Sequence, residues 1–183
     1  MRTKAPVMPW HKAIWFPRSV PRWAIILWIA LLGRLSTKDR LLAWGVTADD
    51  ACTLCGAGHE SHDHLFFGCQ YASRIWSHFL QLNGVNRHGL KLRDEVVWIA
   101  QHSGGSSMKN TIFKLSLAAV VYNIWRERNG RIFKGQNLGH DDLISRITSD
   151  LRACFISWRR VEKSDENRLL CYAWRIPVSV FDL

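Results

Sequence analysis

Four side chains of the types that bind transition metals lie within eighteen residues of one another. They are Cys52, Cys55, His64 and Cys69, in the pattern Cys-x2-Cys-x8-His-x4-Cys. A two-residue gap allows a tight turn to direct both thiolates at one ion, and thiolate and imidazole are ligands that Zn²⁺ prefers in closed tetrahedral sites. Four protein ligands leave no position for water, so the spacing predicts one structural zinc ion and not a catalytic one.

Two other histidines compete for the fourth ligand position. We favour His64 because the apolar segment Leu65-Phe66-Phe67 follows it directly and would anchor it against a core. His59 and His62 lie among Gly, Glu, Ser and Asp, a composition that is typical of a loop. The alternative that the cysteines are only buried core residues stays open at this point.

The chain is basic, and the charge is unevenly distributed. Its 183 residues carry a formal charge of +10, which bound Zn²⁺ and three thiolates would change to about +9. Residues 1–48 contain eight Lys or Arg and a single acid, Asp39. A basic surface favours nucleic acid or an anionic membrane as a partner. With 48% hydrophobic residues and ten tryptophans, the chain has enough apolar side chains for a core, so general disorder is not expected.

The remaining cysteines and the apolar run near the N-terminus indicate in which cellular compartment the protein is expected. Cys154 and Cys171 lie in apolar surroundings and are expected in the core. An odd number of cysteines with metal-binding spacing favours a reducing compartment, so we expect an intracellular protein, in the nucleus or cytoplasm, that is not secreted. The apolar run over 23–32 is too short to cross a bilayer, and no membrane partner is expected.

Helical periodicity dominates the first half of the chain after an irregular start at 1–20, which contains Pro6, Pro9 and Pro17. A first helix is expected from Pro21 to about 32, apolar on nearly all sides and therefore buried. A second helix is expected through Trp44, with Ser36 or Thr37 as its cap. The zinc loop follows over 50–70, and a third helix is expected over about 71–83.

The second half is predicted to contain one short helix, two long helices and a tail. The short helix covers about 92–102, and Ser103 to Ser107 forms a flexible break. The long helices cover about 108–133 and 141–162, with Asp141 as a cap of the second. The tail has a short alternating stretch, Val178 to Phe181, that could be extended. No internal repeat is present.

With these residues in view, the chain resembles the zinc-binding domain that follows the reverse transcriptase in plant non-LTR retroelement polyproteins. The resemblance covers roughly residues 8–80. It rests on aromatic, Gly-Arg-Leu and metal-binding positions, namely Trp10, Trp15, Pro21, Trp28, Gly33-Arg34-Leu35, Thr37-Lys38-Asp39-Arg40-Leu41, Trp44-Gly45, Cys52, Cys55, Glu60-Ser61, His64-Leu65-Phe66, Cys69 and Ile75-Trp76. Arg22 departs from the Lys that the family commonly has. A more modest likeness, from Ile124 to Phe133, is to a segment that often follows this domain.

The helical periodicity and the resemblance together predict a mainly α fold: a small helical domain with an embedded Cys-Cys-His-Cys zinc loop, followed by a two-helix C-terminal extension. The expected division is a zinc-binding domain at 8–83, a linker with a short helix at 84–107, a helical extension at 108–165 and a tail at 166–183. By similarity Cys52, Cys55, His64 and Cys69 are the zinc ligands. Glu60 is expected to orient neighbouring groups without binding the metal.

The residues for polymerase or RNase H chemistry are not expected in this chain. Both reactions need spaced carboxylates that hold metal ions. Asp49-Asp50 follows no hydrophobic strand and immediately precedes the zinc loop, so a catalytic role is not predicted for it. The ancestral polyprotein implied by the resemblance would be an RNA-directed DNA polymerase, whereas this piece of it is predicted to be no enzyme and to act on no small-molecule substrate.

The function predicted first is a zinc-stabilised module, derived from a retrotransposon, that binds RNA or DNA without catalysis. Candidate phosphate contacts are Lys38, Arg40, Arg126, Arg128 and Arg131. Arg128 and Arg131 share a helix face at about 3.6 residues per turn, while Arg126 points elsewhere. The alternatives are a protein-interaction module with a protein partner, or a non-functional retroelement remnant.

Overall fold

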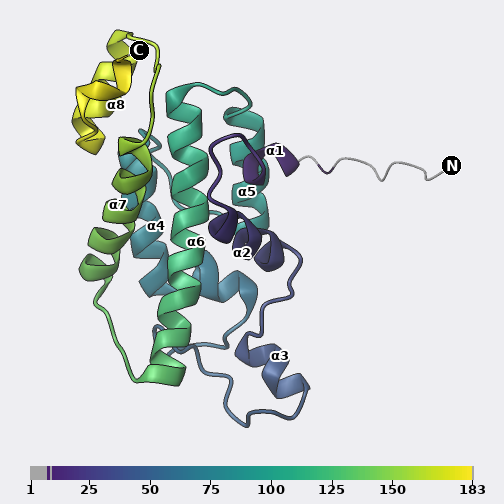
Figure 1. The fold of residues 1–183 in the computed structure, drawn as a ribbon. Helices are drawn as coiled ribbons and strands as arrows, with labels where there is room; N and C mark the ends of the chain where they lie inside the picture. The colour runs from purple at the N-terminus through teal and green to yellow at the C-terminus, as the bar shows by residue number, and fades with distance from the viewer. Residues whose placement is uncertain (1–7, 9, 183) are drawn as a thin grey trace, which may run out of the picture.

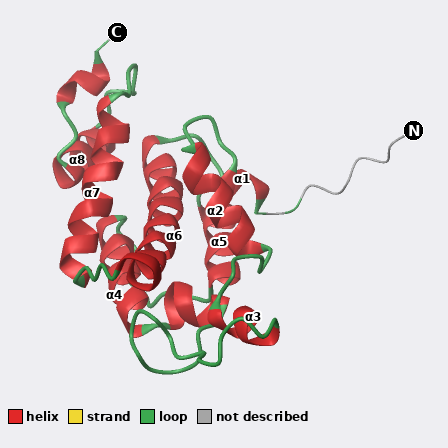
Figure 2. Cartoon of the chain, turned by 60° about the horizontal axis from the view of Figure 1, so that its bottom comes forward, coloured by secondary structure: helices red, strands yellow, loops and turns green. Residues whose placement is uncertain are grey.

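The computed structural model describes residues 8 and 10–182, so Pro6 and Pro9 lie outside the described residues (Figure 1). Within this part of the chain the regular elements are helices, and no strand is formed (Figure 2). In chain order they are α1 (His11–Ile14), α2 (Pro21–Leu31), α3 (Lys38–Ala43), the π-helical turn η1 (His64–Gly68), α4 (Gln70–Leu82), α5 (Leu92–His102), α6 (Met108–Lys134), α7 (His140–Ile156), α8 (Asp165–Trp174) and the 3₁₀ turn η2 (Val178–Phe181).

The long helix α6 is the centre of the fold. Every residue from 111 to 121 is buried, so α6 needs packing partners on all of its sides. Helices α2, α4 and α7 supply most of this packing, and α1, α5 and α8 also contact it. Figure 1 shows α6 running through the middle of the molecule, with α4 and α7 on one side and α1, α2 and α5 on the other. The helices beyond residue 107 therefore share one core with the metal-binding segment.

Stacked aromatic rings connect the metal-binding segment to α6. Phe67 of η1 stacks on Trp76 of α4 with 5.2 Å between ring centroids, and Trp76 stacks on Phe113 of α6 at 6.1 Å. Trp76 is fully buried. Each such pair contributes about 0.5–1.5 kcal/mol beyond the burial of its area, so these rings hold η1 and α4 against the central helix.

Local capping signals explain where several helices begin and end. The Ser107 side chain accepts a hydrogen bond from the backbone N–H of Asn110 and caps the start of α6. Ser164 caps α8 in the same way through Asn167. Pro21 occupies the first turn of α2, as predicted, and α5 has the predicted bounds.

The first half departs from the sequence-based expectations at three places. The segment expected to be irregular contains the short helix α1, because Ala13 and Ile14 bury against the core. Helix α2 is buried on one face only, with Ile25 and Trp28 exposed, so the expectation of burial on all sides was wrong. The Thr37 hydroxyl does not cap α3, because it donates to the Asp39 carboxylate instead of accepting a backbone N–H.

The second half departs from expectation near the C-terminus. Helix α7 ends at Ile156, earlier than predicted, and its cap residue is Gly139, not Asp141. The tail contains helix α8, which we did not predict, and Val178–Phe181 is a 3₁₀ turn and not an extended stretch. Packing of Trp174 against Phe155 of α7 and Phe79 of α4 explains α8, because these partners come from distant parts of the chain.

Candidate metal centre

A tight loop after α3 presents the first two cysteines. The backbone N–H of Cys52 donates to the Gly58 carbonyl (2.9 Å), and the N–H of Gly56 donates to the Cys52 carbonyl (2.8 Å). Gly56 and Gly58 have φ values of +70° and +71°, a left-handed conformation that glycine adopts without a steric penalty. The loop therefore closes on itself and directs the Cys52 and Cys55 side chains to the same side.

The other two candidate ligands flank the turn η1. His64 is the first residue of η1, and Cys69 follows its last residue and is the N-cap residue of α4. The five-residue π-helical turn brings the two together, since the Cys69 N–H donates to the His64 carbonyl. Leu65, Phe66 and Phe67, between them, are buried in the core. This burial is the anchoring that the sequence predicted for His64.

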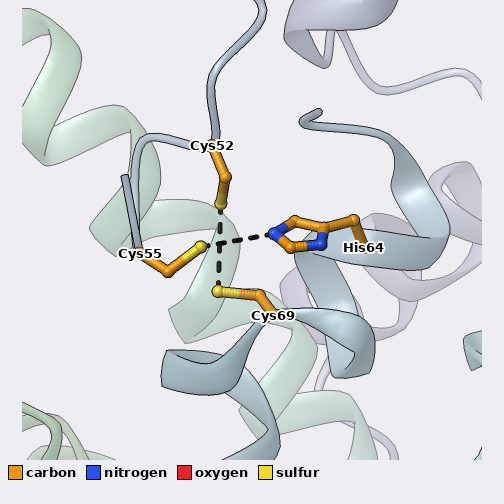
Figure 3. Close-up of side chains that lie close together, drawn as sticks. All are labelled: Cys52, Cys55, His64 and Cys69. Carbon is orange, nitrogen blue, oxygen red and sulfur yellow. Dashed lines mark hydrogen bonds between the residues drawn. The ribbon is translucent and has the colours of Figure 1, made fainter. Parts of the chain in front are cut away.

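The four side chains converge on one point (Figure 3). Their ligand atoms all lie within 4.8 Å of one another. Cys52 Sγ and Cys69 Sγ are 3.8 Å apart, and Cys55 Sγ is 3.4 Å from His64 Nε2. A tetrahedral zinc ion with Zn–S bonds of about 2.3 Å and a Zn–N bond of about 2.0 Å separates two sulfurs by about 3.8 Å, and sulfur from nitrogen by about 3.5 Å. The cluster therefore fits one zinc ion with four protein ligands, which is a structural site.

Two of the thiols lie close enough for each to change the ionisation of the other, with 3.8 Å between Cys52 Sγ and Cys69 Sγ. The hydrogen bond between the Cys52 and Cys69 side chains lowers the pKa of Cys52 to about 5. The same hydrogen bond, together with burial, raises the pKa of Cys69. The two pKa values move in opposite directions because one thiol keeps its proton, and that proton stabilises the neighbouring thiolate. Zn²⁺ would take the place of that proton and hold both sulfurs as thiolates.

Glu60 lies beside the cluster but is not part of it. Its side chain is fully buried, and it accepts hydrogen bonds from the backbone N–H groups of Lys38 (3.0 Å) and Thr53 (3.2 Å). It also forms an ion pair with Arg128 of α6, with Nη2 at 2.7 Å and Nε at 3.0 Å from Oε1. Burial by itself would raise the pKa of Glu60, but these donors outweigh it and the pKa is lowered. Glu60 thus ties α3, the loop between the cysteines and α6 together.

Arg131 holds the same loop one helical turn further along α6. Its Nη1 donates to the Leu54 carbonyl at 2.9 Å, and its Nε donates to Glu127 at 2.8 Å. Thr53 and Leu54 are the two residues between Cys52 and Cys55. Arg128 and Arg131 therefore position the cysteine loop through partners that are 68 and 77 residues away in the sequence. No local sequence pattern indicated this role.

The competing histidines lie away from the cluster. The His59 side chain is 84% exposed and pairs with Asp50 at 2.6 Å. His62 Nδ1 lies 3.3 Å from the Thr37 hydroxyl. Among the described residues, the four predicted side chains are the ones brought together with metal-binding geometry.

The five basic residues expected to contact phosphate have different surroundings. Arg128 is buried against Glu60 and Arg131 donates to loop carbonyls, so the geometry does not support a phosphate contact for either. Lys38 pairs with Asp49 at 2.7 Å. Arg40 donates to the Gly33 carbonyl and lies over the Trp44 ring. Arg126 alone of the five is exposed.

Sequence reasoning missed a basic and aromatic groove around Arg126. It lies between α6 and α7 and has a volume of about 310 Å³. Its basic side chains are Arg126, Lys134 and Arg146, and its aromatic side chains are Tyr122, Trp125 and Phe133. We call this the α6–α7 groove. The sequence signal was the aromatic and basic residues at helical spacing in α6, but Arg146 joins them only through the packing of α7.

Comparison with known proteins agrees with the metal-binding geometry. Residues 1–76 match the family described as zinc-binding in reverse transcriptase, a segment that includes all four ligand residues. Searches of curated proteins and of solved structures each found no match. In the described part of the chain, no helix is long and apolar enough to cross a membrane. The plant and retroelement context of the resemblance stays a prediction. The segment up to residue 76 is therefore similar to the zinc-binding domains of reverse transcriptases.

Proposed function

We propose that the chain binds single-stranded RNA or DNA, without catalysing a reaction, along the α6–α7 groove. The observation that carries this proposal is the gathering of Arg126, Lys134 and Arg146 around three aromatic side chains in one groove. Cations bind the phosphates of a nucleic acid, and exposed aromatic rings stack on its unpaired bases.

The groove offers both kinds of contact in accessible form. Arg126, Lys134 and Arg146 are exposed, and Phe133 is 76% exposed. Arg126 and Lys134 are eight positions apart on α6, which corresponds to about 12 Å along the helix. This length allows the two cations to contact different phosphates of one strand.

The acidic residue in the groove does not oppose an anionic ligand. Glu127 is 3% exposed, and Arg131 neutralises it at 2.8 Å. The same Arg131 donates to the Leu54 carbonyl of the cysteine loop. A zinc ion at the cluster would therefore support this end of α6 through Arg128 and Arg131, without contacting the nucleic acid itself.

The experiment is binding of labelled single-stranded RNA to the zinc-loaded chain across a salt series. Three phosphate contacts predict a slope of log K against log salt of about −2. Arg126→Ala and Arg146→Ala should each weaken binding and make the slope shallower. Arg93→Ala on α5, which replaces an exposed arginine outside the groove, is the matched control. A flat salt response, or equal losses in all three variants, would exclude the groove as the binding site. The same titration with single-stranded DNA of the same sequence then shows which nucleic acid binds more tightly.

A second candidate function is protein interaction, favoured by a different surface. Leu169, Tyr172 and Val178 are 71%, 87% and 75% exposed. Tyr172 and Val178 line a groove of about 890 Å³ between α8 and the chain that follows it. Exposed apolar surface of this kind marks protein-binding sites. Light scattering after size-exclusion chromatography tests self-association. A concentration-dependent dimer that Tyr172→Asp abolishes would support it, and a monomer with no RNA affinity would favour a retroelement remnant.

A further inference from the structure

A second pocket lies near the start of α6, far along that helix from the metal cluster. It has a volume of about 450 Å³ and lies between α1, the chain that follows α1, and the Gly104–Ser106 loop. Three cations, Lys12, Arg18 and Lys114, line it together with the rings of Trp15 and Phe16. We call this the α1–α6 pocket.

Lys114 is the unusual member of this group. It is 5% exposed, although lysine is rarely buried without an ion-pair partner. Its ammonium group donates to the Gly105 carbonyl at 3.0 Å and lies 5.2 Å from the centroid of the Phe16 ring. An ammonium group has three donors, so the carbonyl satisfies one of them. Burial lowers the pKa of Lys114, because its charge has lost water without gaining an anion.

None of the described residues that line the α1–α6 pocket is acidic. Glu162 and Glu166 line a neighbouring pocket that shares Arg18, and Glu166 pairs with Lys109 at 3.4 Å. Arg18 itself lies over the Trp158 ring, with its Cζ 4.6 Å from the ring centroid. The three cations therefore face a cavity with no internal counter-charge.

We propose that the α1–α6 pocket binds a phosphate group, with Lys114 as its central ligand and Lys12 and Arg18 at its rim. A phosphate has enough acceptor oxygens to fill the open donors of Lys114 and to contact both rim cations. The adjacent Trp15 and Phe16 rings provide a surface for a planar base. The phosphate is therefore either free or part of a nucleotide, and the experiment distinguishes these two sources.

The test is isothermal titration calorimetry of the zinc-loaded full chain with inorganic phosphate and with adenosine monophosphate. Saturable one-to-one binding is expected. Lys114→Met, which keeps an unbranched side chain one atom shorter and removes its charge, should weaken binding by at least about tenfold. Lys12→Gln, at an exposed position, should weaken it by about threefold. Tighter binding of the nucleotide identifies a nucleotide pocket, and equal affinity identifies a site for phosphate alone.

Controls separate this proposal from the proposed function. Lys134→Gln removes a cation of the α6–α7 groove and should reduce RNA binding while leaving phosphate binding unchanged. Lys12→Gln should reduce phosphate binding while leaving RNA binding unchanged. If thermal melting shows that Lys114→Met is unfolded, the double variant Lys12→Gln/Arg18→Gln tests the proposal in its place. Its phosphate affinity should be about tenfold weaker than that of the unchanged chain. Absence of saturable phosphate binding, or unchanged affinity in a folded Lys114→Met chain, would overturn the proposal.

Discussion

The ion pair between Glu60 and Arg128 provides the sharpest prediction, because it joins the metal loop to the central helix. Replacing Arg128 with Met leaves the Glu60 carboxylate fully buried, with the backbone N–H groups of Lys38 and Thr53 as its remaining donors. Breaking a buried pair on one side typically costs about 3–5 kcal/mol. Since two donors remain, we expect a loss of about 3 kcal/mol in the free energy of unfolding.

Two measurements check this loss. For a chain of 183 residues, a loss of about 3 kcal/mol lowers the melting temperature by about 6–12 °C. Zinc affinity, measured by competition with a chelator, should fall by about tenfold or more, because Glu60 holds the N–H of Thr53 between two ligand cysteines. Glu60→Gln combined with Arg128→Met should recover part of the stability, since it removes the uncompensated charge.

The matched control is Arg126→Met, on the same helix but exposed. It should change the stability by no more than about 0.5 kcal/mol while weakening RNA binding. If Arg128→Met left stability and zinc affinity unchanged and weakened RNA binding instead, Arg128 would be a phosphate contact, and the structural role derived from its ion pair would be refuted.

Zinc removal with a chelator should unfold the cysteine loop, because structural zinc contributes about 10 kcal/mol of folding free energy in small modules. Circular dichroism and thermal melting of the metal-free chain test this, and an unchanged melt would contradict it. Cys52→Ser should reduce zinc content to the same extent, whereas Cys171→Ser, in the core near the C-terminus, should retain one zinc per chain. Burial lowers the pKa of His78 below its usual 6.5, an effect that Asp141 opposes. The unfolded chain therefore takes up a proton first, and stability should be full above pH 6.5 and decrease as the pH falls toward the folded-state pKa. His78→Gln should flatten this pH dependence in equilibrium unfolding, and His88→Gln, at an exposed position, should not; equal slopes in both variants would refute the assignment.

The helices could be predicted wherever their signals are local. Pro21 marks the start of α2, and Ser107 caps α6 within its own first turn. Helix α8 was missed because its packing depends on Trp174, which contacts Phe79 and Phe155 from distant parts of the chain. The cap predicted at Thr37 failed because its hydroxyl found the Asp39 carboxylate, while Glu60 took the N–H of Lys38.

The sequence by itself determined the metal-binding pattern. Cys52, Cys55, His64 and Cys69 are close in the chain, so a turn and a short helix suffice to bring them together. Only the tertiary structure decided the roles of the arginines on α6. The partners Glu60 and Arg128 are 68 residues apart, and no periodicity in the chain records that pairing. The tertiary structure also placed Arg146 of α7 in the same groove as Arg126, and Lys12 in the same pocket as Lys114. Charge in a sequence shows that cations are present, but burial and packing decide which of them are neutralised inside the protein and which face a ligand.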